Sequence, residues 1–171
     1  GNGWGAGNKA KLVKGPDIFC EVVERLSKRY KIFVLLTGPS RGYVKNRLDE
    51  SNIRYRHDIL QDVNSLVDYY NSIDLYIIAS REEGGPKSLL ESFACGVPIV
   101  STKVGMAPDL IEHNENGYLV DVEDIEGLYS YACKIIDSKE IANQFTINGL
   151  KTVQNYDWKD ISEEYYKVLY S

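Results

Sequence analysis

Residues 74–102, DLYIIASREEGGPKSLLESFACGVPIVST, contain the pattern that decides the fold. The apolar runs at 74–80 and 97–102 have the length of strands buried in a sheet, and residues 88–95 between them have helical spacing. A strand, a helix and a second strand within about 30 residues form a crossover unit, which joins parallel strands. This stretch therefore predicts an α/β fold.

The same alternation continues on both sides of this stretch. The sequence predicts strands or extended segments at 32–38, 53–57 and 117–121, and helices at 16–30, 43–50, 63–71, 107–113, 124–137, 139–150 and 159–170. We expect strand 32–38 to be buried on both faces, and helix 63–71 to turn Val63, Leu66, Val67 and Tyr70 inward. Repeated alternation of strand and helix predicts a Rossmann-like open parallel sheet with helices on both faces.

The length and composition favour a soluble protein of one domain. A chain of 171 residues can bury its own core, and no apolar run approaches the roughly 20 residues that cross a bilayer. Cys20, Cys95 and Cys133 are widely spaced and odd in number, which disfavours a disulfide framework or a zinc site. We expect reduced, buried thiols in a cytoplasmic protein.

The charge is unevenly distributed along the chain. The first 56 residues hold 12 Lys and Arg against 5 Asp and Glu, whereas the whole chain has a net charge of -5. A basic segment can favour an anionic ligand, although two oppositely charged solvated faces would give the same count. Nucleic acid is not favoured as a partner, because the basic residues lack interleaved aromatic residues or a known reading motif.

A candidate anion site follows the strand at 74–80. Ligands of open parallel sheets bind beyond the carboxyl ends of the strands, where SREEGGPK lies. Gly84 and Gly85 allow close approach of backbone to ligand, and the N–H groups of Lys87, Ser88 and Leu89 begin a helix. An ordinary strand-to-helix turn would use the same glycines.

Two carboxylates accompany this turn and indicate a second kind of ligand group. Glu83 and Glu91 are separated by seven residues, with one at the turn and one in the helix. Carboxylates accept hydrogen bonds, and paired hydroxyls donate them. Backbone donors for phosphate beside carboxylates for hydroxyls fit a nucleotide diphosphate sugar better than a bare phosphate.

The string EGGPKSLLESFACGVPIV (83–100) resembles a motif of retaining glycosyltransferases with the GT-B fold, in glycosyltransferase family four (glycosyl transferases group 1). KGPDIF (14–19), LLTG (35–38) and ENGYLVD (115–121) extend the resemblance over essentially the whole chain. The resemblance implies that residues 1–171 are the C-terminal, donor-binding domain, and that an N-terminal acceptor domain is absent from this chain.

The resemblance also implies roles for single residues. Glu83 contacts hydroxyls of the donor sugar, and Glu91 holds the ribose hydroxyls. Lys14 pairs with the diphosphate and offsets charge on the leaving group, so that Glu83 and Lys14 are the catalytic candidates. The segment Gly84, Gly85, Pro86, Lys87, Ser88 and Leu89 faces the sugar and the diphosphate.

The sequence departs from the family pattern at two places. The family has Gly-Arg on a first strand about five residues before the lysine, whereas this chain has Lys9 at that spacing and Lys11 as a rival. Pro86 stands where many members have a second glycine, which removes one N–H donor. Ile59 and Leu60 occupy the place of the family's nucleobase wall, although core packing would explain them equally well.

The implied reaction is transfer of a sugar from a nucleotide diphosphate sugar to an acceptor hydroxyl, in surface polysaccharide or glycan synthesis. The resemblance implies no cofactor and no metal, and it places the full-length enzyme in the cytoplasm, with peripheral association at the cytoplasmic face of a membrane. The rival hypothesis is a non-catalytic module that binds a nucleotide or a nucleotide sugar.

Overall fold

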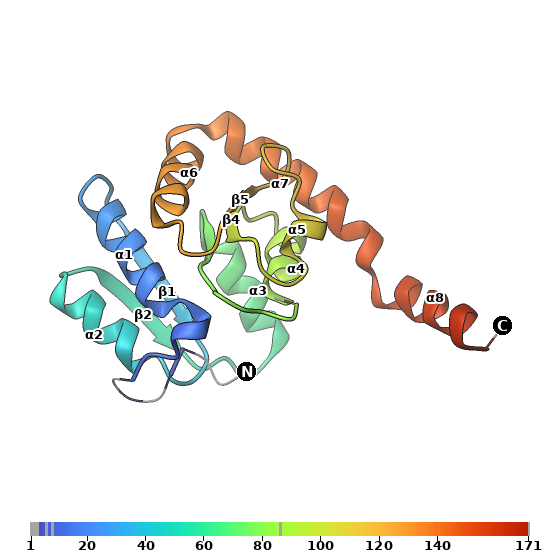
Figure 1. Ribbon diagram of the computed structural model, residues 1–171, viewed down its shortest axis with the longest axis horizontal. Helices are drawn as coiled ribbons and strands as arrows, with labels where there is room; N and C mark the ends of the chain where they lie inside the picture. The colour runs from blue at the N-terminus through green and yellow to red at the C-terminus, as the bar shows by residue number, and fades with distance from the viewer. Residues whose placement is uncertain (1–3, 6, 8, 86, 171) are drawn as a thin grey trace.

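The structure is a computed structural model that describes residues 4, 5, 7, 9–85 and 87–170, so Pro86 lies outside the described residues (Figure 1). The elements follow in the order η1 (Leu12–Lys14), α1 (Pro16–Ser27), β1 (Phe33–Thr37), α2 (Gly42–Glu50), β2 (Arg54–Asp58), α3 (Val63–Asn71), β3 (Tyr76–Ile78), α4 (Lys87–Ala94), β4 (Ile99–Thr102), α5 (Ala107–Leu110), β5 (Tyr118–Val120), α6 (Ile125–Asp137), α7 (Lys139–Val153), η2 (Gln154–Tyr156) and α8 (Trp158–Tyr170).

The strands of the described residues form two parallel ladders. One ladder pairs β1 with β2, and the other has the order β3–β4–β5. The predicted α/β class with parallel strands and flanking helices is therefore confirmed, with two hydrogen-bonded ladders in place of one continuous sheet.

Several helices begin at residues whose side chains cap the first turn. Asp62 accepts from the N–H of Ser65 before α3, and Asp124 accepts from the N–H of Gly127 before α6. α1 begins differently, with Gly15 at the cap and Pro16 at the first helical position, where a missing N–H costs nothing. α5 is shorter than predicted and ends at Leu110, because the Asn116 side chain accepts from the N–H of Glu112 and donates to the Leu110 carbonyl.

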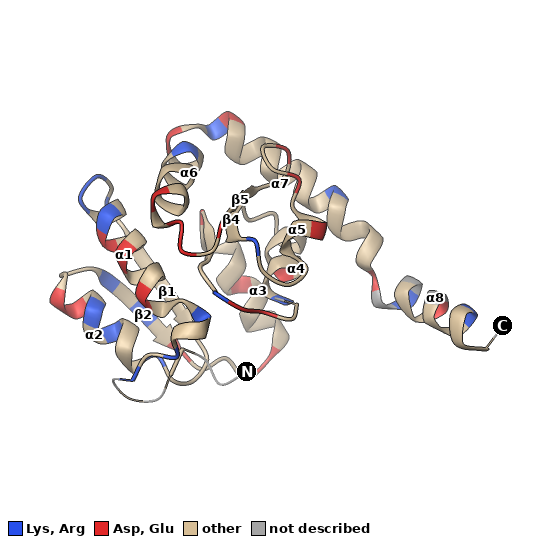
Figure 2. Cartoon of the chain, viewed as in Figure 1, with Lys and Arg blue, Asp and Glu red and all other residues tan. Residues whose placement is uncertain are grey.

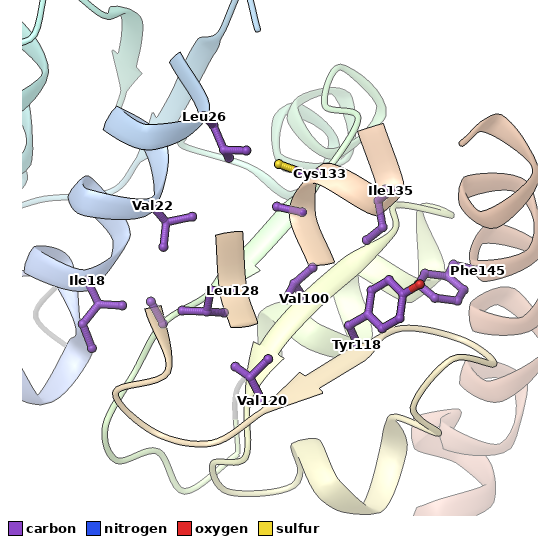
Figure 3. Close-up of a cluster of buried hydrophobic side chains, with 12 residues drawn as sticks. Ile18, Val22, Leu26, Val100, Tyr118, Val120, Leu128, Cys133, Ile135 and Phe145 are labelled. Atoms are coloured by element: carbon purple, nitrogen blue, oxygen red, sulfur yellow. The ribbon is translucent and has the colours of Figure 1, made fainter. Parts of the chain in front are cut away.

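α1 and α6 lie side by side over one face of the β3–β4–β5 ladder (Figure 3). Ile18, Val22 and Leu26 recur at every fourth residue of α1, and this spacing puts them on one face of the helix. Their cluster also contains Ala79, Val100, Tyr118, Val120, Leu128, Ala132, Cys133, Ile135 and Phe145.

A second cluster covers the opposite face of this ladder with α4 and α5. Alternate residues of β4 supply the two faces, because Val100 lies in the first cluster and Ile99 in the second. The other buried members of the second cluster are Ile78, Leu89, Phe93, Val104, Ala107, Leu110 and Ile111. This packing fixes α4, the helix that follows the candidate site.

α1 also packs on the β1–β2 ladder and so joins the two ladders. Cys20 and Val23 of α1 form a third cluster with residues of β1 and α2, namely Val34, Leu36, Val44 and Leu48, and with Ile53 before β2. Within the described residues the cysteines are free; Cys20 and Cys133 are buried, whereas Cys95 is only partly buried.

Two predictions of burial were wrong. Strand β1 was expected to be buried on both faces, but it is buried on one face only, because α1 and α2 both cover that face. Phe33 lies on the opposite face and is 51% exposed. Helix α3 packs mainly through Tyr70 in its last turn, which is 6% exposed, so that Val63 and Val67 remain 74% and 39% exposed.

Ion pairs between distant segments match part of the uneven charge distribution. Figure 2 shows Lys and Arg on α1, α2 and β2, and acidic residues on later segments. Arg25 of α1 pairs with Glu126 at 2.6 Å, and Arg29, which follows α1, pairs with Asp137 at 2.7 Å; these two pairs tie the C-terminal end of α1 to α6. Two of the basic residues in the first 56 therefore serve the packing of α1 against α6.

The last helix, α8, extends away from the rest of the chain (Figure 1). Several of its large side chains are exposed, including Tyr165, Tyr166, Val168, Leu169 and Tyr170. In the part of the chain that the structure describes, no helix has the length and apolar character needed to span a membrane.

We predict that Thr102→Val lowers the free energy of unfolding by about 1–3 kcal/mol, because it leaves a buried acceptor without its donor. Thr102 is fully buried, and its hydroxyl donates to the Ser80 carbonyl at 2.7 Å, which joins the ends of β3 and β4. Urea denaturation measures the change.

Thr37→Val is the matched control, because Thr37 ends β1 and its hydroxyl makes no hydrogen bond among the described residues. We expect it to change the free energy of unfolding by less than about 0.5 kcal/mol. Equal effects of the two substitutions would show that the hydroxyl of Thr102 is not what stabilises this end of the ladder.

Candidate functional site

The site is organised by a close backbone contact between Gly15 and the carboxyl end of β3. Gly15 has a φ of 61°, and a Cβ added to it would lie 1.8 Å from the Ala79 carbonyl oxygen. No other residue type fits there without moving one of the two backbones, because the left-handed conformation and the contact both exclude a side chain. Glycine therefore allows η1 and the start of α1 to lie on the end of β3.

The carbonyls of η1 accept hydrogen bonds from the loop that follows β3. The backbone N–H groups of Arg81 and Glu82 donate to the Val13 carbonyl at 2.9 and 3.2 Å. The Ser80 hydroxyl lies 3.5 Å from the Lys14 carbonyl. These contacts place the Lys14 side chain above the loop.

Lys14 and Glu83, the two catalytic candidates, contact one another. The Lys14 Nζ lies 2.5 Å from Glu83 Oε2, and the two side chains are 23% and 20% exposed. The Ser80 hydroxyl donates to Glu83 Oε1 at 2.9 Å and fixes the carboxylate from the other side. The sequence assigned both residues to one site, whereas the contact between them follows from the fold.

Glu91 is held by a buried tyrosine of α3. The Tyr70 hydroxyl donates to Glu91 Oε2 at 3.0 Å, and it lies 3.4 Å from the Ser88 carbonyl. Burial raises the pKa of Tyr70 far above its usual value, so the hydroxyl stays protonated and remains a donor. One oxygen of Glu91 is thus engaged by the protein.

The loop that contains Gly84 and Gly85 lies against the loop that follows β4. Gly84 and Gly85 are exposed, and a Cβ added to Gly105 would lie 2.5 Å from the Gly84 carbonyl oxygen and 2.8 Å from that of Glu83. Gly105 has a φ of 51°, so a side chain there would be strained as well as crowded. Sequence reasoning missed Gly105, whose only signal was a glycine between a strand and a helix.

The remaining candidates lie in different surroundings. Lys9 is exposed and, among the described residues, its side chain makes no ion pair. Lys87 is exposed at the start of α4, and Ser88 is partly buried. The Leu89 side chain is fully buried in the second cluster, so only its backbone can face a ligand.

Ile59, which follows β2, is 62% exposed, so core packing does not account for it. Because β2 is parallel to β1, Ile59 lies at the carboxyl edge of their ladder.

Arg81 connects three segments around the site, and sequence reasoning missed it too. Its guanidinium binds the Asp17 carboxylate through two contacts of 2.8 Å, and it also contacts Glu123 and the Leu12 carbonyl. Hydrogen bonding from Arg81 lowers the pKa of Asp17 below its usual value and so stabilises the ionised carboxylate. Asp17 and Glu123 are distant in sequence, and no local pattern pairs them with an arginine.

Among the described residues, no group of three or more His, Cys, Asp and Glu side chains is placed to hold a metal ion. Among the described residues, the polar groups at the end of β3 include the Lys14 ammonium, the Glu83 carboxylate, the Ser80 hydroxyl and backbone N–H groups. Such a set can bind an anion beside hydroxyl groups.

Comparison with known proteins agrees with this architecture. An uncharacterized glycosyltransferase from Haemophilus influenzae is 27% identical over 160 residues, which are 91% of this chain and 45% of the relative. N-acetyl-alpha-D-glucosaminyl L-malate synthase from Bacillus anthracis is 26% identical over 141 residues, which are 82% of this chain and 37% of that enzyme. The chain therefore spans less than half the length of these relatives.

Solved structures share the fold at lower identity. The C-terminal domain of a glycosyl transferase group 1 family protein, LpcC of Francisella tularensis, has a TM-score of 0.77 at 22% identity, over 86% of this chain and 82% of that domain. HepE from Anabaena in complex with UDP has a TM-score of 0.78 at 21% identity, over 98% of this chain and 49% of HepE.

The family itself is shown by a match along most of the chain. The model for the family described as glycosyl transferases group 1 matches residues 8–152, which include Lys14, Glu83 and Glu91. The fold of the solved structures agrees with this match, and so does the resemblance of the motif around the two glutamates. The chain belongs to the glycosyl transferases group 1 family and has the fold of GT-B glycosyltransferases.

Proposed function

We propose that this chain is the donor-binding part of a retaining glycosyltransferase that transfers a sugar from a nucleoside diphosphate sugar to an acceptor hydroxyl. The observation that carries the proposal is the contact of Lys14 with Glu83 at the end of β3, directly before α4. A cation and a carboxylate are the two groups that a ligand with a diphosphate and a sugar requires side by side.

Each group of the site has a place in this reaction. Departure of the nucleoside diphosphate develops negative charge, which the Lys14 ammonium and the N–H groups at the start of α4 offset. Glu83 accepts hydrogen bonds from sugar hydroxyls, and the Glu91 oxygen that Tyr70 does not contact accepts from the ribose. The exposed Ile59 provides an apolar surface for the base.

Binding of the donor replaces the contact between Lys14 and Glu83. The diphosphate takes the ammonium and the sugar hydroxyls take the carboxylate, so that neither charge is left unpaired when the two separate. A nucleoside diphosphate without its sugar satisfies only Lys14. The exchange therefore favours a ligand that carries both groups.

Relatives support this choice of ligand and reaction. HepE was solved in complexes with UDP and with UDP-glucose, and one curated relative is a capsular polysaccharide biosynthesis glycosyltransferase from Staphylococcus aureus. We propose polysaccharide or glycan synthesis in the cytoplasm, at the membrane face, without a metal or cofactor. The acceptor contacts are assigned to the part of the longer relatives that this chain does not match.

Glu91→Gln should weaken binding of UDP by about 1–3 kcal/mol, because it removes the charge of an acceptor for the ribose hydroxyls. Calorimetry with UDP and uridine measures the loss, which should be similar for both ligands. Glu82→Gln is the control, since Glu82 is exposed beside the site and its side chain makes no hydrogen bond or ion pair among the described residues. Unchanged affinity in folded Glu91→Gln would refute the role of Glu91.

Lys14→Ala should weaken UDP binding and leave uridine binding nearly unchanged, because only UDP carries the diphosphate. The difference should shrink as ionic strength rises, since salt screens the interaction of partly exposed charges. Lys31→Ala is the control, because Lys31 is exposed before β1, at the opposite end of the strands. An equal loss for uridine would make Lys14 a residue of the fold instead.

Glu83→Gln should separate the sugar from the nucleotide. We expect UDP to bind the variant at least as well as the wild type, because Lys14 loses its competing partner. UDP-glucose should lose the advantage that its sugar provides. Binding of the two ligands is compared by calorimetry, and parallel losses would mean that Glu83 does not face the sugar.

A further inference from the structure

Arg81 follows β3 beside the site, and its side-chain donors are all taken by the protein. Its NH1 group donates to the Leu12 carbonyl at 2.5 Å and to Asp17 Oδ1 at 2.8 Å. Its NH2 group donates to Asp17 Oδ2 at 2.8 Å and to Glu123 Oε2 at 3.1 Å, and its Nε donates to Glu123 Oε1. A guanidinium has five N–H donors, and these contacts use each of them.

This geometry argues against Arg81 as a phosphate ligand. Two carboxylates more than neutralise its single positive charge, and a phosphate would have to break one of the forked contacts to reach an N–H. Arg81 and Asp17 are 23% and 30% exposed, so their contact is partly shielded from water. The guanidinium is a connector between protein segments.

One of the segments that Arg81 connects carries Lys14. The Leu12 carbonyl belongs to η1, Asp17 to the first turn of α1, and Glu123 to the turn between β5 and α6. The backbone of Arg81 binds η1 as well, because its N–H donates to the Val13 carbonyl at 2.9 Å. Side chain and backbone of one residue therefore fix the short helix that ends in Lys14.

We infer that Arg81 is a positioning residue for Lys14: it binds no donor itself, and it contributes to donor binding by holding η1 and α1 over the end of β3. This inference rests on the proposed function, because Lys14 is taken as the cation for the diphosphate. A lysine cannot replace Arg81, since an ammonium lacks the fork that binds two carboxylates and a carbonyl together.

A double-mutant cycle between Arg81 and Lys14 tests the inference. Arg81→Lys keeps the positive charge beside the site and removes the fork. Calorimetry with UDP and with uridine is applied to the wild type, Arg81→Lys, Lys14→Ala and the double variant. If Arg81 acts through Lys14, Arg81→Lys weakens UDP binding by about tenfold, leaves uridine binding unchanged, and removes most of the further loss caused by Lys14→Ala.

Arg25→Lys is the matched control. Arg25 also ties α1 to another segment, through Glu126, and its side chain is 31% exposed. The Arg25→Lys protein should bind UDP with the affinity of the wild type. Adding Lys14→Ala to Arg25→Lys should weaken UDP binding as much as Lys14→Ala does in the wild type. A general loss of helix anchoring would instead affect both arginine variants alike, which would overturn the inference.

Additive losses, within about twofold, would also overturn it, because independent sites add. If Arg81→Lys does not fold, Asp17→Asn replaces it in the cycle, since the amide keeps one acceptor for Arg81 and loses the charge. The same selective loss of affinity for UDP is expected.

The failure of the proposed function and the failure of the inference give different results. If the wild type binds none of UDP, GDP and ADP, the proposed function fails together with the inference. If the wild type binds one of them and the losses are additive, only the role of Arg81 is contradicted.

Discussion

The contact of Gly15 with the carboxyl end of β3 is the constraint on which the site depends. A side chain at this position would meet the Ala79 carbonyl oxygen at 1.8 Å, so only glycine lets the two segments touch. Because Gly15 both ends η1 and caps α1, the contact sets the place of Lys14 on one side and of the core helix on the other. The close contact between the backbones of Gly15 and Ala79 therefore couples the packing of α1 to the position of Lys14 in the site.

Opposite charges then fix what the backbone contact brings together. Arg25 near the end of α1 and Arg29 just after it pair with α6, and Asp17 in the first turn of α1 pairs with Arg81, so the helix is tied to the rest of the chain at both ends. Surface ion pairs contribute little singly, but pairs that share one rigid helix act together. Some of the charges along the sequence thus have their partners far away in the chain.

Neutral and charged partners play different parts within the site. Ser80 and Tyr70 donate to one oxygen each of Glu83 and Glu91, and these hydroxyls orient the carboxylates without adding charge. Lys14 is the partner that a diphosphate can take away, since its contact with Glu83 is electrostatic and partly exposed. The proposed exchange of partners on donor binding follows from this difference between fixed and replaceable contacts.

The sequence by itself determined the parallel α/β fold, nearly all of the elements and the presence of Lys14, Glu83 and Glu91 in one motif family. The fold and its elements follow from hydrophobic periodicity, turn residues and spacing, which are local properties of the chain, whereas Lys14, Glu83 and Glu91 were assigned to one site through the family resemblance. Only the tertiary structure decided that β1 is buried on one face, that Val63 and Val67 are exposed, and that Arg81 joins Asp17 to Glu123. Local patterns could not give these results, because each depends on which surfaces meet after the helices have packed on the two ladders.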